Sequence, residues 1–224
     1  MDFDKLEKIF LDNNINPNEA EEIVLQAKQF EELMMMYKCA IREVKTKLEV
    51  LNDEFSVKYK RNPIEFIKDR IKEPMSIVDK LRRDNNEISI PSIMYNLNDV
   101  AGIRVICSFI DDIYDVANML TKQDDIKLIK MKDYIKNPKD NGYRSLHLIV
   151  EVPVFFSDRK QPMKVEVQIR TIAMDFWASL EHKLKYKKNI KECQVISEEL
   201  KQCADVISST DNKMQEIKYR IDEN

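Results

Sequence analysis

The feature that most restricts how this chain can fold is an unbroken alternation of apolar and polar residues from Met163 to Arg170. The odd-numbered residues of this run are all apolar and the even-numbered ones are all charged or polar, as in a β-strand with one buried face. Residues 145–152 alternate in nearly the same way, except that Ile149 falls among the polar residues. Two such neighbouring strands predict a sheet with one apolar face and one charged face. Because a charged sheet face is often only a solvated surface, the alternation alone leaves a functional role open.

The composition is that of a globular chain with many solvated helix faces. Of its 224 residues, 43% are hydrophobic, which is enough for a core, and 34% are charged, which is above the usual share. This length fits one domain with helical extensions better than two full domains. The net charge of −3 argues against tight binding of nucleic acid through bulk electrostatics, so we expect no stable nucleic-acid partner.

The sequence predicts neither a membrane segment nor a structural metal site. No apolar run approaches the length of a membrane helix, and residues 1–5 do not resemble the start of a signal peptide. The four cysteines are scattered without a Cys-x-x-Cys pair, and the chain has two histidines, so a structural zinc site is not expected. We therefore expect reduced thiols, a cytoplasmic location and no membrane partner.

Apolar residues at spacings of three and four predict several helices around this sheet. The longest follows Pro17 and extends to about residue 57, and a second long helix covers residues 192–221. Shorter helices are predicted over 2–13, over 62–71, over 76–83 and over 111–122, and two further strands over 103–107 and 126–131. The apolar stripes of the two long helices exceed what a small sheet can cover, which predicts a homo-oligomer built by helix packing.

Two glycines and two carboxylates stand out near the predicted strands. Gly102 and Gly142 are the only glycines, and a chain that otherwise avoids glycine is expected to need an unusual backbone or a close ligand approach there. Asp99 lies just ahead of the strand at 103–107, and Glu166 lies in the middle of the alternating strand. Their oxygens suit Mg²⁺, which proteins hold through one or two carboxylates together with substrate phosphates.

Basic residues accompany these carboxylates, and they suit a polyphosphate: Arg70, Lys72, Lys80, Arg83, Arg104, Lys132, Lys139, Arg144 and His147. Phosphoryl-type transfer needs positioned substrates, a metal, cations and a group that orients the attacking hydroxyl. The two carboxylates can hold the metal, and these side chains can provide the rest. Tyr143 could stack on a nucleobase, although packing is the commoner role of such a tyrosine. If Tyr143 stacks on a base, the substitution Tyr143→Phe should leave the activity nearly unchanged. The sequence has no Gly-rich phosphate loop and no pattern of a covalent nucleophile.

Three separated runs, in this order, closely resemble the synthetase domain of the Rel/SpoT-like alarmone enzymes: Asp99–Arg104, Gly142–His147, and Glu166–Thr171 followed by Phe176–His182. The resemblance covers residues 37–186, and the short length is similar to that of the small alarmone synthetases. It implies an α+β fold, a nucleotidyltransferase-like mixed β-sheet flanked by helices. The implied division is an N-terminal helical extension over 1–36, a synthetase domain over 37–188 and a C-terminal helix over 189–224.

The reaction implied by the resemblance is transfer of the β,γ-diphosphate of ATP to the ribose 3′-hydroxyl of GDP or GTP, with release of AMP; GMP is a further candidate acceptor. Asp99 and Glu166 would bind Mg²⁺ and act in catalysis, with Glu166 activating the hydroxyl. The ATP site would comprise Arg70, Lys72, Ser76, Lys80, Arg83 and Arg104. The guanine-nucleotide site would comprise Tyr143, stacked on the base, together with Lys132, Lys139, Arg144, His147, Gln168, Asp175 and Glu181. Lys132 stands where a close relative has arginine, which keeps the charge but loses a bidentate fork.

The family also implies a homotetramer, in which some members bind alarmone between subunits through basic residues of the first family helix. Lys45 and Phe66 could serve such a site, but Glu49 and Asn52 lie where a basic side chain would be expected. We therefore do not expect allosteric activation to carry over.

Two other hypotheses come from different functional classes. One is a catalytically silent module on the same fold that binds guanine nucleotide or RNA, and the other is a helical scaffold whose sheet face is merely solvated. The presence of both Asp99 and Glu166 argues against the first, because a pure binder needs no metal pair. The second leaves the placement of the two glycines and the mixed-charge face unexplained.

Overall fold

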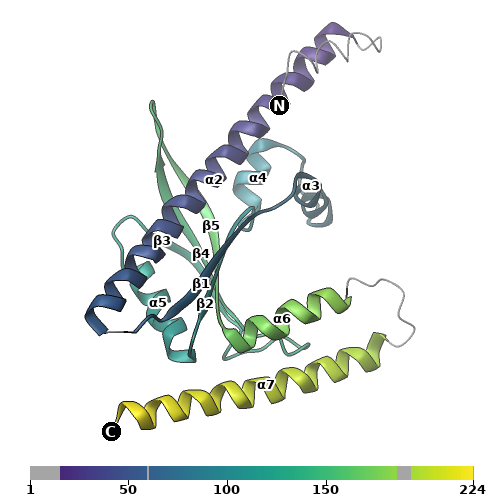
Figure 1. Ribbon diagram of the computed structural model, residues 1–224. Coiled ribbons are helices and arrows are strands. Elements are labelled where there is room, and N and C mark those ends of the chain that lie inside the picture. The colour runs from purple at the N-terminus through teal and green to yellow at the C-terminus, as the bar shows by residue number, and fades with distance from the viewer. Residues whose placement is uncertain (1–15, 60, 186–192, 224) are drawn as a thin grey trace.

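A five-stranded mixed sheet forms the centre of the protein in the computed structural model, which describes residues 16–59, 61–185 and 193–223 (Figure 1). The strands are β1 (Ile64–Ile71), β2 (Ala101–Cys107), β3 (Lys127–Asp133), β4 (Leu146–Phe155) and β5 (Lys160–Thr171), and their order in the sheet is β1-β2-β5-β4-β3. β2 and β5 are parallel, and every other neighbouring pair is antiparallel. The predicted pairing of the two alternating strands is confirmed as β4 and β5.

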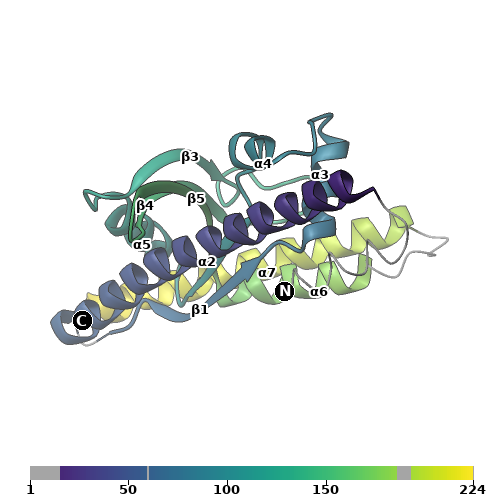
Figure 2. The same cartoon turned by 90° about the horizontal axis from the view of Figure 1, so that it is seen from above.

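Six described helices surround this sheet: α2 (Pro17–Tyr59), α3 (Pro74–Arg83), α4 (Ile90–Asn96), α5 (Ile110–Thr121), α6 (Ile172–Lys185) and α7 (Cys193–Asp222). The long helix α2 runs along the sheet, and α3 and α4 lie near its N-terminal half (Figures 1 and 2). α6 and α7 lie side by side at one end of the sheet. The predicted helix over 2–13 falls outside the described residues.

The apolar face of the sheet packs against α2 and α5 to form the core. The odd-numbered residues of β5 from Met163 to Ile169 are buried, as are Leu146, Leu148 and Val150 of β4. From α2, Leu33 and Leu48 reach this core with no exposed surface. The alternation predicted this burial correctly, because the period of two assigns every apolar residue of a strand to one face.

The prediction of a helix over 62–71 is wrong, because residues 64–71 form the edge strand β1. Ile64, Ile67 and Ile71 suggested a helix through spacings of three and four. A spacing of four also keeps side chains on one face of a strand. The spacing of three arises at an irregularity in the pairing between Ile64 and Phe66, where the register with β2 shifts by one residue.

The helix α4 was not predicted from the sequence. Its start carries ordinary signals, since Ser89 is the N-cap and its hydroxyl accepts a hydrogen bond from the amide of Ser92 at 3.3 Å, while Pro91 occupies the first turn. The helix has only seven residues, which is too short for an apolar period to show. In the part of the chain that the structure describes, no helix combines the length and apolarity needed to cross a membrane.

Candidate active site

Two rows of side chains cross the polar face of the sheet, one residue from each strand. The strand register places in the first row Lys68, Arg104, Gln168, His147 and Lys132. It places in the second row Arg70, Gly102, Glu166, Ile149 and Lys130. Several residues named from the sequence are therefore neighbours on one surface, with Glu166 on the central strand.

Asp99 lies two residues before β2 and holds two lysines. Its carboxylate oxygens each accept a hydrogen bond at 2.7 Å, one from Nζ of Lys72 and the other from Nζ of Lys80. Burial alone would raise the pKa of Asp99, but the hydrogen bonds and charges of the two lysines outweigh it and hold the pKa below its usual value. The predicted metal ligand is thus an anion that gathers two of the predicted ATP-binding cations around it.

Glu166 is held by two neighbours on the polar face. Nε2 of Gln168 donates to Oε2 of Glu166 at 2.8 Å, and Nδ1 of His147 lies 3.4 Å from Oε1. Burial raises the pKa of Glu166, but the contacts with His147 and Gln168 lower it by more, so the net shift is downward. The negative charge of Asp99 acts in the opposite direction and raises it, so the two carboxylates repel each other. A cation between them would relieve that repulsion.

Asp99 and Glu166 could hold a divalent cation together with ligands from a substrate. Among the described residues, no group of three or more His, Cys, Asp or Glu side chains could hold a metal by itself. Two ionised carboxylates with further ligands from phosphate oxygens are the usual protein environment of Mg²⁺.

A buried arginine that was not among the predicted site residues lies at the centre of the site. Arg170 is 2% exposed, and its Nη2 donates to the Tyr143 hydroxyl at 2.9 Å and to Oε1 of Gln168 at 2.8 Å. The Tyr143 oxygen also lies 2.8 Å from Nε2 of His147. With the two contacts of Glu166, these form a closed ring of five side chains. The alternation did place Arg170 on the polar face, but nothing in the sequence distinguished it from a solvated arginine.

The Tyr143 hydroxyl joins Arg170 to His147 in this ring. An arginine can only donate, so the Tyr143 oxygen accepts from Arg170 and its own proton is available for Nε2 of His147. The other ring nitrogen of His147, Nδ1, faces Glu166. Burial raises the pKa of Tyr143, with the positive charge of Arg170 opposing, so the hydroxyl keeps its proton at neutral pH.

The aromatic side of the site is built from Tyr143, Tyr134 and His147. Their rings meet edge to face, with centroids between 5.2 and 6.1 Å apart. Nζ of Lys139 lies 4.8 Å from the centre of the Tyr134 ring and 4.9 Å from that of Tyr143. Tyr134 was not among the predicted site residues, because it comes from the irregular segment before β4 and carries no periodic signal.

Arg70 and Arg104 border a small cleft on the same face, with a volume of about 170 Å³ and lined by Lys68, Asp69, Arg70, Gly102, Ile103, Arg104 and Gln168. A Cβ atom on Gly102 would lie 3.3 Å from Cγ and Nε of Arg70, so the glycine gives the Arg70 side chain room to cross the strand. Arg104 faces Asp175 at 3.4 Å, and that carboxylate is shared with Arg170 at 3.3 Å.

Four of the remaining predicted residues lie at the rim or turn away from this surface. Ser76 and Arg83 are exposed on α3, where Arg83 faces Asp84 at 3.5 Å, and Lys132 is exposed on the edge strand β3. Arg144 instead points to α7. Glu181 accepts a hydrogen bond at 3.0 Å from the side chain of Asn141, a loop residue that was not among the predicted site residues.

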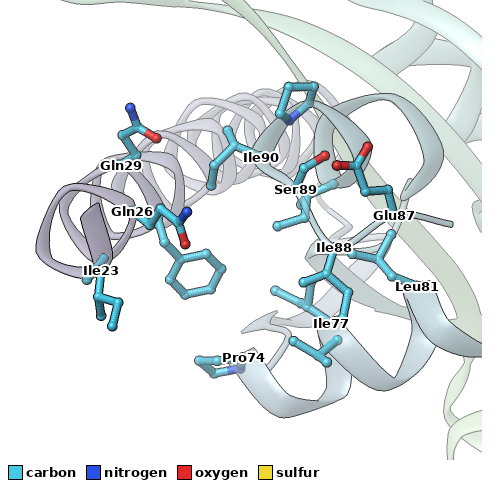
Figure 3. Close-up of a pocket in the computed structure, with 15 residues that line it drawn as sticks. Ile23, Gln26, Gln29, Pro74, Ile77, Leu81, Glu87, Ile88, Ser89 and Ile90 are labelled. Atoms are coloured by element: carbon cyan, nitrogen blue, oxygen red, sulfur yellow. The ribbon is translucent and has the colours of Figure 1, made fainter. Parts of the chain in front are cut away.

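An apolar cavity of about 590 Å³ lies away from both rows, between α2 and the α3–α4 segment (Figure 3). Aliphatic side chains such as Ile23, Ile77, Leu81 and Ile90 line most of it. A polyphosphate needs cations and hydrogen-bond donors, so the polar sheet face and not this cavity is the candidate active site.

The chain is similar in sequence to several known proteins. A family model described as "Region found in RelA / SpoT proteins" matches residues 69–191. The chain is 47% identical over 189 residues to the GTP pyrophosphokinase YwaC of Bacillus subtilis, which covers 84% of this chain and 90% of that one. It is 36% identical over 197 residues to the GTP pyrophosphokinase YjbM of the same organism, and the match covers 88% of this chain and 92% of that one.

Solved structures give the same result. The crystal structure of small alarmone synthetase 1 from B. subtilis bound to its product pppGpp superposes with a TM-score of 0.79 at 37% identity, covering 87% of this chain and 98% of that one. Small alarmone synthetase 2 from B. subtilis superposes with a TM-score of 0.76 at 44% identity, covering 85% and 98%. The predicted α+β fold, a mixed sheet flanked by helices, is confirmed by these matches.

Proposed function

Because the chain belongs to the family of RelA and SpoT proteins, we propose that it is an alarmone synthetase. It transfers the β,γ-diphosphate of ATP to the ribose 3′-hydroxyl of GDP or GTP and releases AMP. The names of its relatives, GTP pyrophosphokinases, support the reaction, and the pppGpp bound to one solved relative supports the class of product. The observation that carries the proposal is the pair of ionised carboxylates, Asp99 and Glu166, on a sheet face rich in cations.

Glu166 is the proposed base. Its lowered pKa keeps it ionised at neutral pH, and the central strand aims it at a fixed position on the polar face. As the 3′-oxygen bonds to the β-phosphorus of ATP, its proton passes to Glu166. The bond from that phosphorus to the oxygen bridging it to the α-phosphate breaks, and AMP leaves with the electron pair.

The cations act on the phosphates of ATP. Ion pairs join Asp99 to Lys72 and Lys80, and the neighbouring cleft is bordered by Arg70 and Arg104. All four side chains can therefore neutralise the negative charge that develops on the transferred group. Ser76 and Arg83 extend this site along α3. A Mg²⁺ ion, for which Asp99 and Glu166 are the proposed ligands, would supply further charge neutralisation at the phosphate oxygens.

The acceptor nucleotide belongs on the aromatic side, where Tyr143 is the proposed stacking surface for guanine. Lys139 already lies over the Tyr143 ring, and His147 and Gln168 lie between that ring and Glu166. Lys132, Asp175 and Glu181 complete the proposed acceptor site, whereas Arg144, also predicted there, contacts α7 instead.

A homotetramer in the cytoplasm is the proposed state of the protein. Exposed apolar side chains remain on both long helices, among them Ile23 and Leu25 on α2 and Val206 and Met214 on α7. Allosteric activation by alarmone is not part of the proposal, because Lys45 already pairs with Asp69 at 3.0 Å and the side chain of Asn52 accepts a hydrogen bond from the amide of Ile64 at 3.2 Å. A monomer by light scattering would contradict the assembly.

The decisive test is product analysis after incubation with Mg²⁺-ATP and GMP, GDP or GTP in turn. We expect AMP and a guanosine 3′-diphosphate product that appear together, depend on the acceptor and stop when EDTA removes the metal. Nucleotide binding without AMP release would instead favour a silent binding module on the same fold. Activity that survives complete metal removal would refute the proposed role of Mg²⁺.

A further inference from the structure

The C-terminal helix α7 lies outside the segment matched by the family model, which ends at residue 191. Yet it contacts the loop that carries Tyr143. The guanidinium of Arg144 donates from Nη1 to the carbonyl oxygen of Ala204 at 3.4 Å, and its Nη2 lies 3.3 Å from the carboxylate of Asp205. The same Nη1 donates to the carbonyl oxygen of Gly142 at 3.2 Å. Arg144 therefore joins its own loop to the helix.

Gly142 meets the helix directly. Its φ of +86° is a conformation that residues with a side chain rarely adopt, and a Cβ atom there would lie 2.5 Å from Cβ of Ala204. The special backbone expected at this glycine is thus present, and the group that approaches closely is a helix of the same chain. Gly142 and Ala204, the two smallest residue types, allow the loop and the helix to touch.

The loop between Lys139 and Tyr143 is tied together by its own hydrogen bonds. The amide of Gly142 donates to the carbonyl of Lys139 at 2.8 Å, and the amide of Lys139 donates to the carbonyl of Tyr143 at 3.2 Å. The amide of Tyr143 donates to the side chain of Asn141 at 3.2 Å. A displacement of Gly142 would therefore move Tyr143 with it.

α7 is anchored on both sides of this contact. Nε1 of Trp177 donates to the carbonyl of Leu200 at 2.8 Å, and the hydroxyl of Thr171 donates to Asp211 at 2.6 Å. The amide of Asp111 donates to the side chain of Gln215 at 3.1 Å. The space that remains between the loop, α6 and α7 is only about 20 Å³. The helix is thus a fixed support against which the loop packs.

We infer that α7 positions the acceptor nucleotide, and that Arg144 is a positioning residue that acts through α7 and not a direct ligand of the acceptor phosphates. This rests on the proposed function, in that Tyr143 receives the base of the acceptor. The helix sets the place of Gly142, the loop transmits it, and Tyr143 presents its ring accordingly. The proposed ATP-binding cations come from β1, from the segment between β1 and α3, from α3 and from β2, and they have no part in this contact.

Ala204→Val tests the contact with Gly142, because the added methyl groups must displace the loop. We expect the KM of the acceptor to rise by about 5- to 150-fold, the range that corresponds to loss of a base–aromatic stack, while the KM of ATP stays unchanged. Cys203→Val is the matched control, since it introduces the same side chain one residue earlier at an exposed position of the helix. Equal effects of the two variants, or equal losses for ATP and acceptor, would overturn the inference.

Arg144→Gln, compared across GMP, GDP and GTP, separates positioning from phosphate binding. A positioning residue gives the same relative loss with each acceptor, and its effect is less than additive with Ala204→Val because both act on one contact. A phosphate ligand instead gives a loss that grows with the number of phosphates and adds to that of Ala204→Val. The second pattern would overturn the inference.

The affinity of each variant for GDP, measured by calorimetry without ATP, keeps this test independent of turnover. If the wild type binds GDP but releases no AMP, the proposed function fails while the affinities still test the role of α7. If Ala204→Val binds GDP as tightly as the wild type, the positioning role fails whatever the activity. Circular dichroism confirms that each variant is folded, and Arg144→Gln stands as the second probe should Ala204→Val not fold.

Discussion

Tyr143 and His147 are joined by a 2.8 Å contact between the phenol oxygen and Nε2 of the imidazole. The other imidazole nitrogen faces Glu166 at 3.4 Å. The residue proposed to stack on guanine is thus connected, through one side chain, to the carboxylate proposed to activate the acceptor. Changes at the aromatic side of the site should therefore be felt at the carboxylate, and the first two predictions depend on this link.

Tyr143→Phe should lower the activity, although stacking alone would predict almost no effect of this substitution. Removing the hydroxyl leaves Nη2 of Arg170 and Nε2 of His147 without their shared partner in a mostly buried place, which costs about 1–3 kcal/mol. We expect a loss in kcat/KM for the acceptor of that order. Tyr143→Leu should lose the stack as well, a further cost of about 1–3 kcal/mol. Steady-state kinetics of both variants check this, and a Phe variant with wild-type kinetics would show that the hydroxyl contacts do not matter.

Arg170→Lys should disturb the site although it keeps the positive charge. The guanidinium contacts Tyr143, Gln168 and Asp175 through two nitrogens, whereas a lysine has one nitrogen and cannot reach all three. We expect a coupling energy with Tyr143→Phe of about 0.5–3 kcal/mol in kcat/KM for the acceptor, measured by a double-mutant cycle. Strictly additive effects would mean that Arg170 stabilises the sheet without acting on Tyr143.

Glu166→Gln should abolish most of the turnover and leave the fold intact. The substitution adds no volume and lies on the polar face, but it removes the charge that accepts the proton. The loss of base catalysis should lower kcat by about 10²- to 10⁴-fold, while ATP binding suffers less because the cations remain. Measurement of kcat and ATP affinity, with circular dichroism as the folding control, checks this. A folded variant that keeps most of its turnover would reduce Glu166 to part of a solvated surface.

Asp211→Asn on α7 should stabilise the protein at neutral pH. Burial raises the pKa of Asp211, and the hydrogen bond from Thr171 only partly opposes it. A carboxyl with a raised folded-state pKa contributes stability below its unfolded pKa and loses it as the pH rises through the folded value. At neutral pH the buried carboxylate of Asp211 therefore destabilises the fold when it is ionised. An asparagine avoids this penalty, and its side-chain oxygen can still accept the hydrogen bond from Thr171. Urea unfolding should show a gain of about 0.5–2 kcal/mol at pH 7 that disappears in acid. A destabilised variant at neutral pH would contradict this.

The elements predicted correctly from the sequence are long ones with one buried face, because burial of that face requires apolar residues at a regular spacing. β4 and β5 alternate because one face of each is covered, and α2 and α7 are long enough to show a helical stripe. β1 was missed because one irregular pairing step turned a strand period into a helical one. Its identity as a strand depends on pairing with β2, which no local pattern records.

The same distinction applies to the candidate site. Residues on alternating strands, such as Glu166, His147 and Gln168, could be placed on one face from the sequence, because a face follows from the period. The burial of Arg170 could not be predicted in this way, because it depends on contacts with Tyr143, which lies in a loop, and with Asp175, which lies on a helix. The contact of Arg144 with Ala204 joins residues that are 60 positions apart, and no local pattern predicts it.

Glu166 lies on β5, which is hydrogen-bonded to β2 on one side and to β4 on the other. To expose this part of the backbone, the protein must break two strand ladders at once, whereas β1 and β3 at the edges can fray singly. The amide protons around Glu166 should therefore exchange with solvent only when the whole sheet opens. On heating, Glu166 should then keep its place until the transition that unfolds the sheet, because it lies on the strand that is paired on both sides.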